Sequence, residues 1–515
     1  MASQTGLHSI PPEILEEIAL TTAVCDGLRP PITLAALSAV DRRTAASLSL
    51  SSNTSLSALL FYHYFDSNAL KRRLGERVTN AFLADELRRR FMCMKRIRKG
   101  NDAQIQTANR EPTLKLLAFA YTLLTENEGK NMSFLLEYAQ LDKWIDAYWF
   151  SDEGASRVMD DLKQDRWPEE GINNTFAMWV LWLLMGSDTA RFTDEVHTVD
   201  VMKLYALGAH RYPSTLLRWG LFDATEDYTR TTATYYEDIK LAPPPASTPG
   251  ILAFLTIVNR LVNRPGYTLS DNGIGPSLPT FYGGEWDADW SRSIDRPIST
   301  HASICDVYQP RSIEGVWQGL FTYTEFTSYA RLLAGAPPNT LQRSIVVRHR
   351  QTWKLREYHL QLSPGDPVSF GARVPLGSPL RSHVPRDVRM EEDEDGLTVT
   401  DANERVYRYA RPKASESEVN PKADVGASRS PICDIIIVGE GHSSWGQFSL
   451  FGRIRPWDGF ISISKEYVDG DRGTWLYRGY LVGGARGNLV GRWRDTLSPD
   501  NITGYEGCFT MGRRQ

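Results

Sequence analysis

Serine, cysteine and histidine are the first candidates for chemistry, because nucleophilic catalysis needs a hydroxyl or thiol beside a base, usually on a strained Gly-x-Ser-x-Gly turn. The sequence lacks that string. His442 precedes Ser443 and Ser444 in a glycine-rich segment, but this composition is also typical of a tight β-turn, and we favour a hairpin there. No phosphate-binding glycine motif follows a predicted strand. The sequence therefore favours a protein that is not an enzyme and that needs no cofactor.

Histidine and cysteine spacing predicts no metal site. His8, His63, His197 and His210 have no second ligand at i+3 or i+4, and the five cysteines form no Cys-x-x-Cys pair. We therefore expect reduced thiols. The N-terminal apolar stretch contains acidic residues, and no apolar run approaches the roughly 20 residues of a membrane-spanning helix. These features predict a cytoplasmic or nuclear protein with no membrane partner.

A basic segment at residues 71–99 is the main charge feature. It holds 11 basic and 3 acidic residues, a local net charge of +8, whereas the whole chain has 58 basic against 62 acidic residues. An acidic partner could dock there. However, apolar residues recur at helical spacing in the same segment, so one side is already committed to packing. We therefore favour a solvated helix face over a nucleic-acid site.

A lysine in the C-terminal third is the main candidate for ligand binding. Within residues 461–467, strand alternation places Lys465 and Tyr467 on the same face as two isoleucines. If that face lines a barrel, an ammonium lies inside and needs a partner or water. A mouth lined by Lys465, Tyr467, Trp475 and Tyr477 could then receive a peptide end or a polar ligand. In the alternative, aromatic rings fill the core and Lys465 reaches the rim. Both interpretations stay open.

The elements that would position these residues change along the chain. Residues 11–99 show helical periodicity, including one long helix over about 68–99, and residues 112–310 continue as a helical array that prolines 243–245 interrupt. Residues 263–295 are predicted to form an ordered loop rich in Gly, Pro and Trp.

From about residue 313 the apolar period becomes two, with glycines between short strands. A closed barrel is favoured over an open sheet, because exposed apolar edges would aggregate. Two polar segments, 391–396 and 412–431, are predicted as loops, the second disordered. Four arginines are expected to face solvent: Arg453, Arg455, Arg492 and Arg494.

The N-terminal motif Ile-Pro-Pro-Glu-Ile-Leu at residues 10–15, followed by Leu34, Leu37, Val40 and Arg43, resembles an F-box. Thr44 stands where that family often has tryptophan, and the loop at 25–31 is long. F-boxes are three-helix modules that bury this apolar face against the Skp-type adaptor of a cullin-RING ubiquitin ligase. The resemblance implies these adaptor-binding residues: Ile10, Pro11, Glu13, Ile14, Leu15, Ile18, Leu34, Leu37 and Val40.

The C-terminal glycines and aromatics carry a second resemblance. The patterns Gly315-x-Trp317-x-Gly319, Lys465-x-Tyr467, Trp475-x-Tyr477-x-Gly479 and Gly491-x-Trp493 resemble the β-domain of F-box-only proteins, whose best-known relative has a cyclin-D-binding domain. This resemblance implies a protein substrate that carries a degron. The implied substrate-binding residues are Lys465, Tyr467, Trp475, Tyr477 and Trp493.

Together these features predict an α+β multidomain protein. The expected domains are a three-helix F-box at 5–50, a helical linker or support region at 51–310, and an antiparallel β-barrel-like domain at 311–515, loop-rich and partly disordered at 390–431. The predicted function is the substrate-recognition subunit of an SCF-type ligase, which contributes by proximity and not by a catalytic side chain. The alternative is a stand-alone β-barrel binder or cryptic enzyme for a small ligand.

Overall fold

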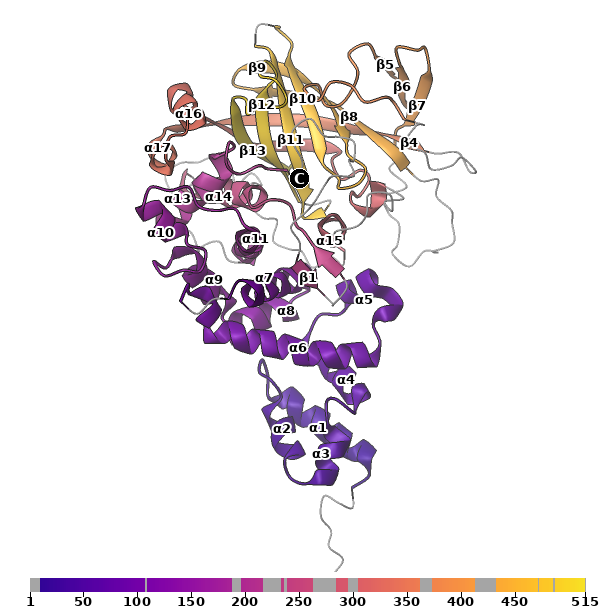
Figure 1. The fold of residues 1–515 in the computed structure, drawn as a ribbon. Coiled ribbons are helices and arrows are strands. Elements are labelled where there is room, and N and C mark those ends of the chain that lie inside the picture. Colours follow the sequence, from indigo (N-terminus) through magenta and orange to yellow (C-terminus); the bar gives the residue numbers. More distant parts are fainter. Residues whose placement is uncertain are drawn as a thin grey trace, which may run out of the picture. The chain divides into compact units, whose positions relative to one another are not determined.

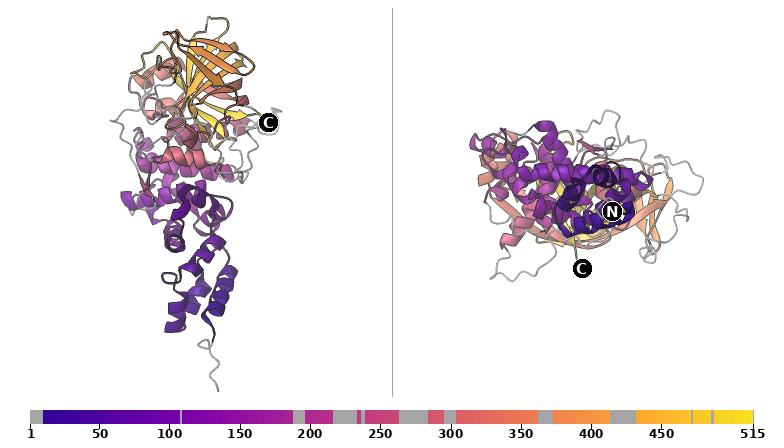
Figure 2. Two further views of the ribbon diagram at one scale, coloured as in Figure 1. Left: turned by 90° about the vertical axis from the view of Figure 1, so that its right-hand side faces the viewer. Right: turned by 90° about the horizontal axis from the view of Figure 1, so that it is seen from below.

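The computed structural model describes residues 10–106, 109–187, 196–215, 233–235, 239–262, 284–294, 304–361, 373–412, 432–470, 472–484 and 487–514. The chain forms two compact units, the first comprising residues 1–159 with 281–284 and the second comprising 160–280 with 285–515. Helices make up the first unit, and the second contains helices and a β-barrel (Figure 1; Figure 2 gives two further views). The predicted α+β class is therefore confirmed.

The first unit begins with three short helices. Two consecutive prolines start α1, where the missing N–H groups have no helical partner to lose. Asp41 caps α3 by accepting hydrogen bonds from the backbone N–H groups of Arg43 (2.8 Å) and Thr44 (2.9 Å). The helices in and at the end of this unit are α1 (Pro12–Cys25), α2 (Ile32–Ser38), α3 (Arg42–Leu48), α4 (Thr54–Tyr64), α5 (Asn68–Leu74), α6 (Asn80–Lys99), α7 (Arg110–Thr125), α8 (Lys130–Ser133), α9 (Leu141–Phe150) and α10 (Val158–Lys163).

The long helix predicted over residues 68–99 is instead two helices. Gly75 ends α5 with a φ of 55°, a left-handed value that glycine adopts without steric cost. Thr79 then caps α6 by accepting a hydrogen bond from the backbone N–H of Phe82 at 3.2 Å. The periodicity was correct on both sides of the break, but the turn interrupts the helix.

The second unit has helices before its barrel and two more between the first two barrel strands along the chain. The ordered loop predicted at 263–295 lies mostly outside the described residues, which cover only 284–294 of this range. Within that part, residues 287–293 form a helix. The helices are α11 (Ile172–Ser187), α13 (Val196–Leu207), α14 (Ser247–Val262), α15 (Asp287–Ser293), α16 (Phe326–Leu333) and α17 (Pro338–Arg343). Two short strands, β1 (Ala233–Tyr235) and β2 (Ile239–Leu241), pair with each other antiparallel.

Eight antiparallel strands close into a barrel, as predicted. Their order is β3-β13-β12-β11-β10-β9-β8-β4, and pairing of β3 with β4 completes the ring. The strands are β3 (Gly315–Thr324), β4 (Val346–Gln361), β8 (Ile432–Ser443), β9 (Gly446–Ile454), β10 (Ile461–Tyr467), β11 (Thr474–Val482), β12 (Asn488–Asp495) and β13 (Glu506–Arg513). Because closure pairs every strand on both sides, the barrel has no free edge.

Three further strands extend from β4 where a loop was predicted. They are β5 (Arg389–Glu392), β6 (Gly396–Thr400) and β7 (Val406–Ala410). Leu397, Val399 and Tyr409 from this part pack into a second apolar cluster with Tyr358 and Ile436. Within the loop predicted at 391–396, residues 393–395 do connect β5 to β6, whereas 391, 392 and 396 belong to strands. The loop-rich region predicted at 390–431 was wrong over 390–410, because buried residues between the charged ones anchor three strands there. The second predicted loop, 412–431, lies outside the described residues from 413 onwards.

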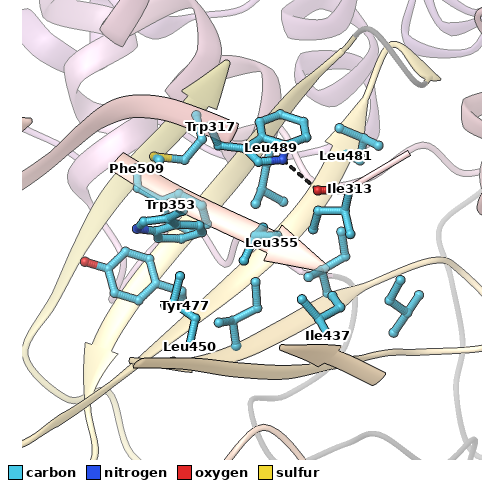
Figure 3. Packing of buried hydrophobic residues seen from close by; sticks show 14 of the residues in the cluster. Ile313, Trp317, Trp353, Leu355, Ile437, Leu450, Tyr477, Leu481, Leu489 and Phe509 are labelled. Atoms are coloured by element: carbon cyan, nitrogen blue, oxygen red, sulfur yellow. Dashed lines mark hydrogen bonds between the residues drawn. The ribbon is translucent and has the colours of Figure 1, made fainter. Parts of the chain in front are cut away.

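Interior glycines make room for large rings in the barrel core. A Cβ on Gly441 would lie 2.3 Å from Cε2 of Phe448, closer than packed atoms allow. A Cβ on Gly507 would likewise lie 2.6 Å from the ring of Trp493, whereas one on Gly479 or Gly491 would meet a backbone oxygen of the neighbouring strand at 1.8 Å. Figure 3 shows part of the resulting core, which includes Trp317, Trp353, Tyr477 and Phe509.

One end of the barrel is closed by the segment that precedes β3. Ile304, Tyr308 and Ile313 belong to the barrel core, and the indole Nε1 of Trp317 donates to the Ile313 carbonyl at 2.7 Å (Figure 3). The buried carboxylate of Glu357 holds this segment by accepting hydrogen bonds from the Tyr308 hydroxyl (2.7 Å) and the Ile313 N–H (2.8 Å). A ligand would therefore approach the interior from the opposite end.

The arginines expected to face solvent are buried instead, so that prediction was wrong. Alternation does place them outside the barrel, but other parts of the second unit cover that face. The guanidinium of Arg453 pairs with Asp434 at 2.6 Å and also donates to the carbonyls of Val374 and His383. The others are likewise held by a carboxylate or by carbonyls of the covering segments: Arg455 by Asp458, Arg492 by Tyr205 and Tyr212, and Arg494 by Ser498 and Pro499.

Candidate functional site

Lys465 lies inside the barrel, which decides between the two interpretations that the sequence left open. Its side chain is 1% exposed, so it does not reach the rim. Tyr467, two residues further on, ends β10. Because a strand rises about 3.3 Å per residue, only about one layer of interior side chains separates Lys465 from the strand end. The lysine is therefore buried but close to the open end of the barrel.

Aromatic rings surround the amine. The ring centroids of Phe448, Tyr467, Phe321 and Tyr477 lie 4.0, 4.9, 5.1 and 5.6 Å from Nζ. We call these four side chains the ring cage. They come from β9, β10, β3 and β11, so the cage exists only when the barrel is closed.

The amine has one hydrogen-bond acceptor in the described part of the chain, Oε1 of Gln351, at 3.2 Å. No carboxylate forms an ion pair with it among the described residues. An ammonium has three donors, so two of them meet only ring faces. Cation–π contacts stabilise the charge by about 0.5–2 kcal/mol each, but desolvation opposes it more strongly. Burial consequently lowers the pKa of Lys465 to about 7, and much of the amine is neutral at physiological pH.

Partly buried rings line the open end above the cage. Tyr323 stacks on His349 with centroids 5.5 Å apart, and His349 contacts Trp445 at 4.9 Å. The ring centroids of Trp475 on β11 and Trp493 on β12 lie 5.2 Å apart. Burial lowers the pKa of His349, which keeps its imidazole neutral at neutral pH. We call Tyr323, His349, Trp445 and Trp475 the aromatic rim.

The structure brings the five predicted substrate-binding residues into one end of the barrel. Lys465, Tyr467 and Tyr477 share the cage, and Trp475 contacts Trp493. Four of them are buried, and only Trp475 is partly exposed. They therefore belong to the packed interior below the open end of the barrel, and Trp475 is the one nearest to solvent.

Sequence reasoning missed Gln351, Phe321, Phe448 and three residues of the aromatic rim. Except for Trp445, which lies in the turn between β8 and β9, each follows the two-residue alternation of its own strand, so alternation could have assigned it to the interior. Their approach to Lys465 depends on strand register, which brings residue 351 next to residue 465 across the barrel. No local pattern encodes that distance.

The residues implied in adaptor binding divide between core and surface. Leu15 and Leu34 are buried, and Ile10 and Leu37 are partly buried. The other five are exposed: Pro11, Glu13, Ile14 (54%), Ile18 and Val40 (56%). Ile32, at the start of α2, is also 58% exposed although sequence reasoning did not select it. We call Ile14, Ile18, Ile32 and Val40 the exposed apolar set.

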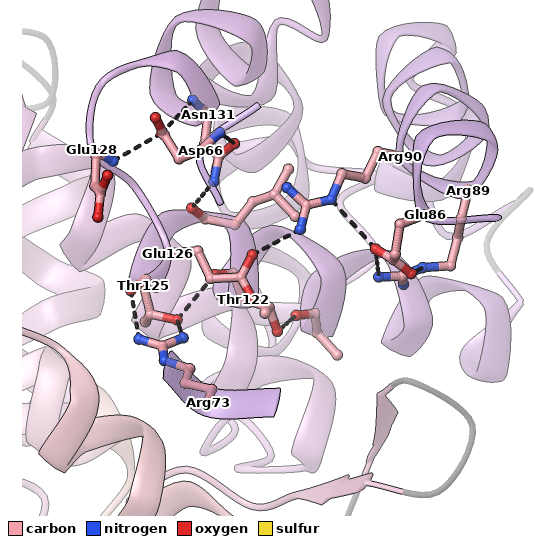
Figure 4. Close-up of polar contacts among 12 residues, drawn as sticks. Asp66, Arg73, Glu86, Arg89, Arg90, Thr122, Thr125, Glu126, Glu128 and Asn131 are labelled. Carbon is pink, nitrogen blue, oxygen red and sulfur yellow. Dashed lines mark hydrogen bonds and ion pairs between the residues drawn. The ribbon is translucent and has the colours of Figure 1, made fainter. Parts of the chain in front are cut away.

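The basic segment of the first unit is largely engaged in internal contacts. Arg90 is fully buried, and its guanidinium pairs with Glu86 at 3.3 Å and Glu126 at 2.8 Å (Figure 4). Arg89 makes two hydrogen bonds to the same Glu86 carboxylate, and Arg96 pairs with Asp102 at 2.6 Å. The net charge counted from the sequence therefore overstates the charge presented to a partner.

Within the described ranges, no group of three His, Cys, Asp or Glu side chains is arranged to hold a metal ion. None of the helices described combines the length and the apolar character needed to cross a bilayer. Comparison of the chain with protein-family models, curated proteins and solved structures finds no match.

Proposed function

We propose that this chain is the substrate-recognition subunit of an SCF-type cullin-RING ubiquitin ligase. The observation that supports this best is the exposed apolar set on and beside α1 and α2. Four large aliphatic side chains in so short a region are left in water, while Leu15 and Leu34 form the core beneath them. Large exposed apolar groups gathered in one region mark interaction sites. The F-box resemblance assigns this region to a Skp-type adaptor.

Burial of the exposed apolar set would contribute free energy to adaptor binding. Full burial of one isoleucine or valine side chain contributes about 1.5–3 kcal/mol. The exposed apolar set could therefore supply several kcal/mol when an adaptor covers it. In this proposal the second unit captures a protein target at the open end of the barrel. The ligase then acts by proximity, since a bound target holds its acceptor lysine near the charged E2.

The test uses substitutions on the surface, so that the fold is kept. Ile14→Asp combined with Val40→Asp should abolish co-purification of the purified full chain with a Skp-type adaptor. Leu59→Asp is the matched control, because Leu59 is an equally exposed aliphatic residue on α4 of the same unit. Circular dichroism would confirm that both variants are folded. Adaptor binding that persists in the double variant at wild-type affinity would refute the proposal.

A second candidate function is a β-barrel binding protein or enzyme for a small ligand. The buried amine of Lys465 favours it, because charged side chains in a barrel core are costly without a role or a partner. Native mass spectrometry of the purified chain discriminates between the two. A bound small molecule without an adaptor supports this second candidate, whereas recovery with adaptor and cullin supports the ligase subunit.

A further inference from the structure

We propose that the Lys465 amine is a covalent attachment site for small aldehydes that enter the barrel through the aromatic rim. This inference goes beyond the proposed ligase function and does not depend on it. It rests on the position of the amine, one side-chain layer below the strand ends, and on the absence of a carboxylate partner in the described residues.

The surroundings of Lys465 favour the neutral amine, which is the nucleophilic form. Its single acceptor, Oε1 of Gln351, satisfies one N–H, and no described residue donates a hydrogen bond to the nitrogen lone pair. A carboxylate would hold the nitrogen as an ammonium, and none lies within ion-pair distance in the described structure. The amine is therefore poised for addition to a carbonyl carbon.

The other titratable groups near the amine do not compete for this proton. The phenols of Tyr467 on β10 and Tyr477 on β11 have pKa values that burial raises, so both stay protonated near neutral pH. The imidazole of His349 on β4 has a lowered pKa and stays neutral. The sides contributed by β3 and β9 present Phe321 and Phe448, which do not titrate.

The reaction balances without a further reactant. The nitrogen lone pair attacks the aldehyde carbon, a C–N bond forms, and one proton moves from nitrogen to oxygen to give a carbinolamine. The C–O bond then breaks, the hydroxyl leaves with a proton as water, and nitrogen loses its second proton. The product is an imine on Lys465 and one water molecule. The hydroxyl of Tyr477, which donates to Gln351 at 3.5 Å, lies within the same cage and can take part in these proton transfers.

The choice of small aldehydes follows from the packing. The interior around Lys465 is filled by the ring cage and neighbouring core side chains. Only a reagent of a few atoms can pass the aromatic rim without displacing several rings at once. The apolar walls also favour an uncharged reagent over an anionic one.

The experiment is reductive methylation of the full chain with formaldehyde and dimethylamine–borane, an uncharged reductant, followed by peptide mass spectrometry. The rate at Lys465 is measured in the folded chain and in guanidinium chloride. At pH 7 about half of an amine with a pKa of about 7 is neutral, against about 1 in 3,000 for an ordinary lysine. Allowing for restricted access, we expect Lys465 to react at least about tenfold faster in the folded chain.

The pH dependence of the ratio of the folded to the unfolded rate provides a second readout, because the same reagents are used in both measurements. Above about pH 8 the ratio should fall about tenfold per pH unit, since only the unfolded lysine continues to gain neutral amine. Lys354, on the outer face of the same barrel, reports reagent delivery in the same digest. Lys465→Met should lose the modified peptide. A ratio below one at pH 7, or a ratio that does not fall with pH, would overturn the inference.

Discussion

Replacing Lys465 by methionine tests the electrostatic description of the barrel interior. A folded-state pKa of about 7, against 10.5 for an ordinary lysine, means that the folded chain binds fewer protons than the unfolded chain between these pH values. The free energy of unfolding of the wild type therefore rises with pH across this interval. Methionine has nearly the same volume and no proton to bind, so the variant lacks this contribution.

The magnitude follows from the size of the pKa change. One pKa unit is worth 1.36 kcal/mol, so full protonation of the buried amine costs the folded state about 5 kcal/mol. Losing the hydrogen bond to Gln351 costs about 0.5–1.5 kcal/mol in the opposite direction. At pH 7 we expect Lys465→Met to be about 3–4 kcal/mol more stable than the wild type. Between pH 8 and pH 10 this advantage should shrink by about 2.5 kcal/mol.

The assay is urea unfolding of the full chain, followed by tryptophan fluorescence at pH 7, 8, 9 and 10 and analysed by linear extrapolation. Lys354→Met, on the outer face of β4, is the matched control for loss of one positive charge from the same barrel. The reasoning would be refuted if the free-energy difference between Lys465→Met and the wild type stayed constant over this pH range. It would also be refuted if the variant were less stable at pH 7.

Two further predictions concern the barrel. Asp434→Ala should lower the free energy of unfolding by about 3–5 kcal/mol, because it leaves the Arg453 guanidinium buried without its carboxylate. The control is Arg408→Met, which removes a solvent-exposed ion pair and should leave the urea midpoint unchanged. Equal effects of the two substitutions would contradict this prediction. Gly441→Val should destabilise the barrel by about 1–3 kcal/mol, because the new Cβ would overlap the Phe448 ring. An unchanged urea midpoint would contradict this, since it would mean that the Phe448 ring moves aside at no cost in stability.

Local periodicity predicts much of the fold, because a strand with one buried face must alternate whatever it pairs with. That rule predicted a closed barrel, which is confirmed, and it put Lys465 on the same face as Ile461 and Ile463. Only the structure shows that this face lines the interior and that the amine does not reach the rim. Helix-capping chemistry likewise explains why α3 begins directly after Asp41. The same periodicity failed at Gly75, where a backbone turn divides a pattern that continues on both sides.

Only the tertiary structure decides whether the outward-facing side chains of the barrel are buried or exposed to solvent. Alternation shows that Arg453 points away from the barrel interior, but not that residues 374 and 383 will lie over it and supply carbonyl acceptors. The sequence therefore suggests a solvent-facing arginine, whereas the folded chain buries it against Asp434. Burial of an outward-facing residue depends on segments far away along the chain.

The sequence by itself determined which face of β10 the Lys465 side chain shares, its neighbours along that strand and the glycines that leave room for rings. The tertiary structure decided the pKa of the Lys465 amine. Gln351 lies 114 residues from Lys465 in the chain, and Phe321 lies further still, yet the closed ring of strands brings both to the amine. The pKa of a lysine is set by what surrounds it in space, by lost water and by the charges nearby. Barrel closure and strand register fix those surroundings, and neither can be read from any short stretch of sequence.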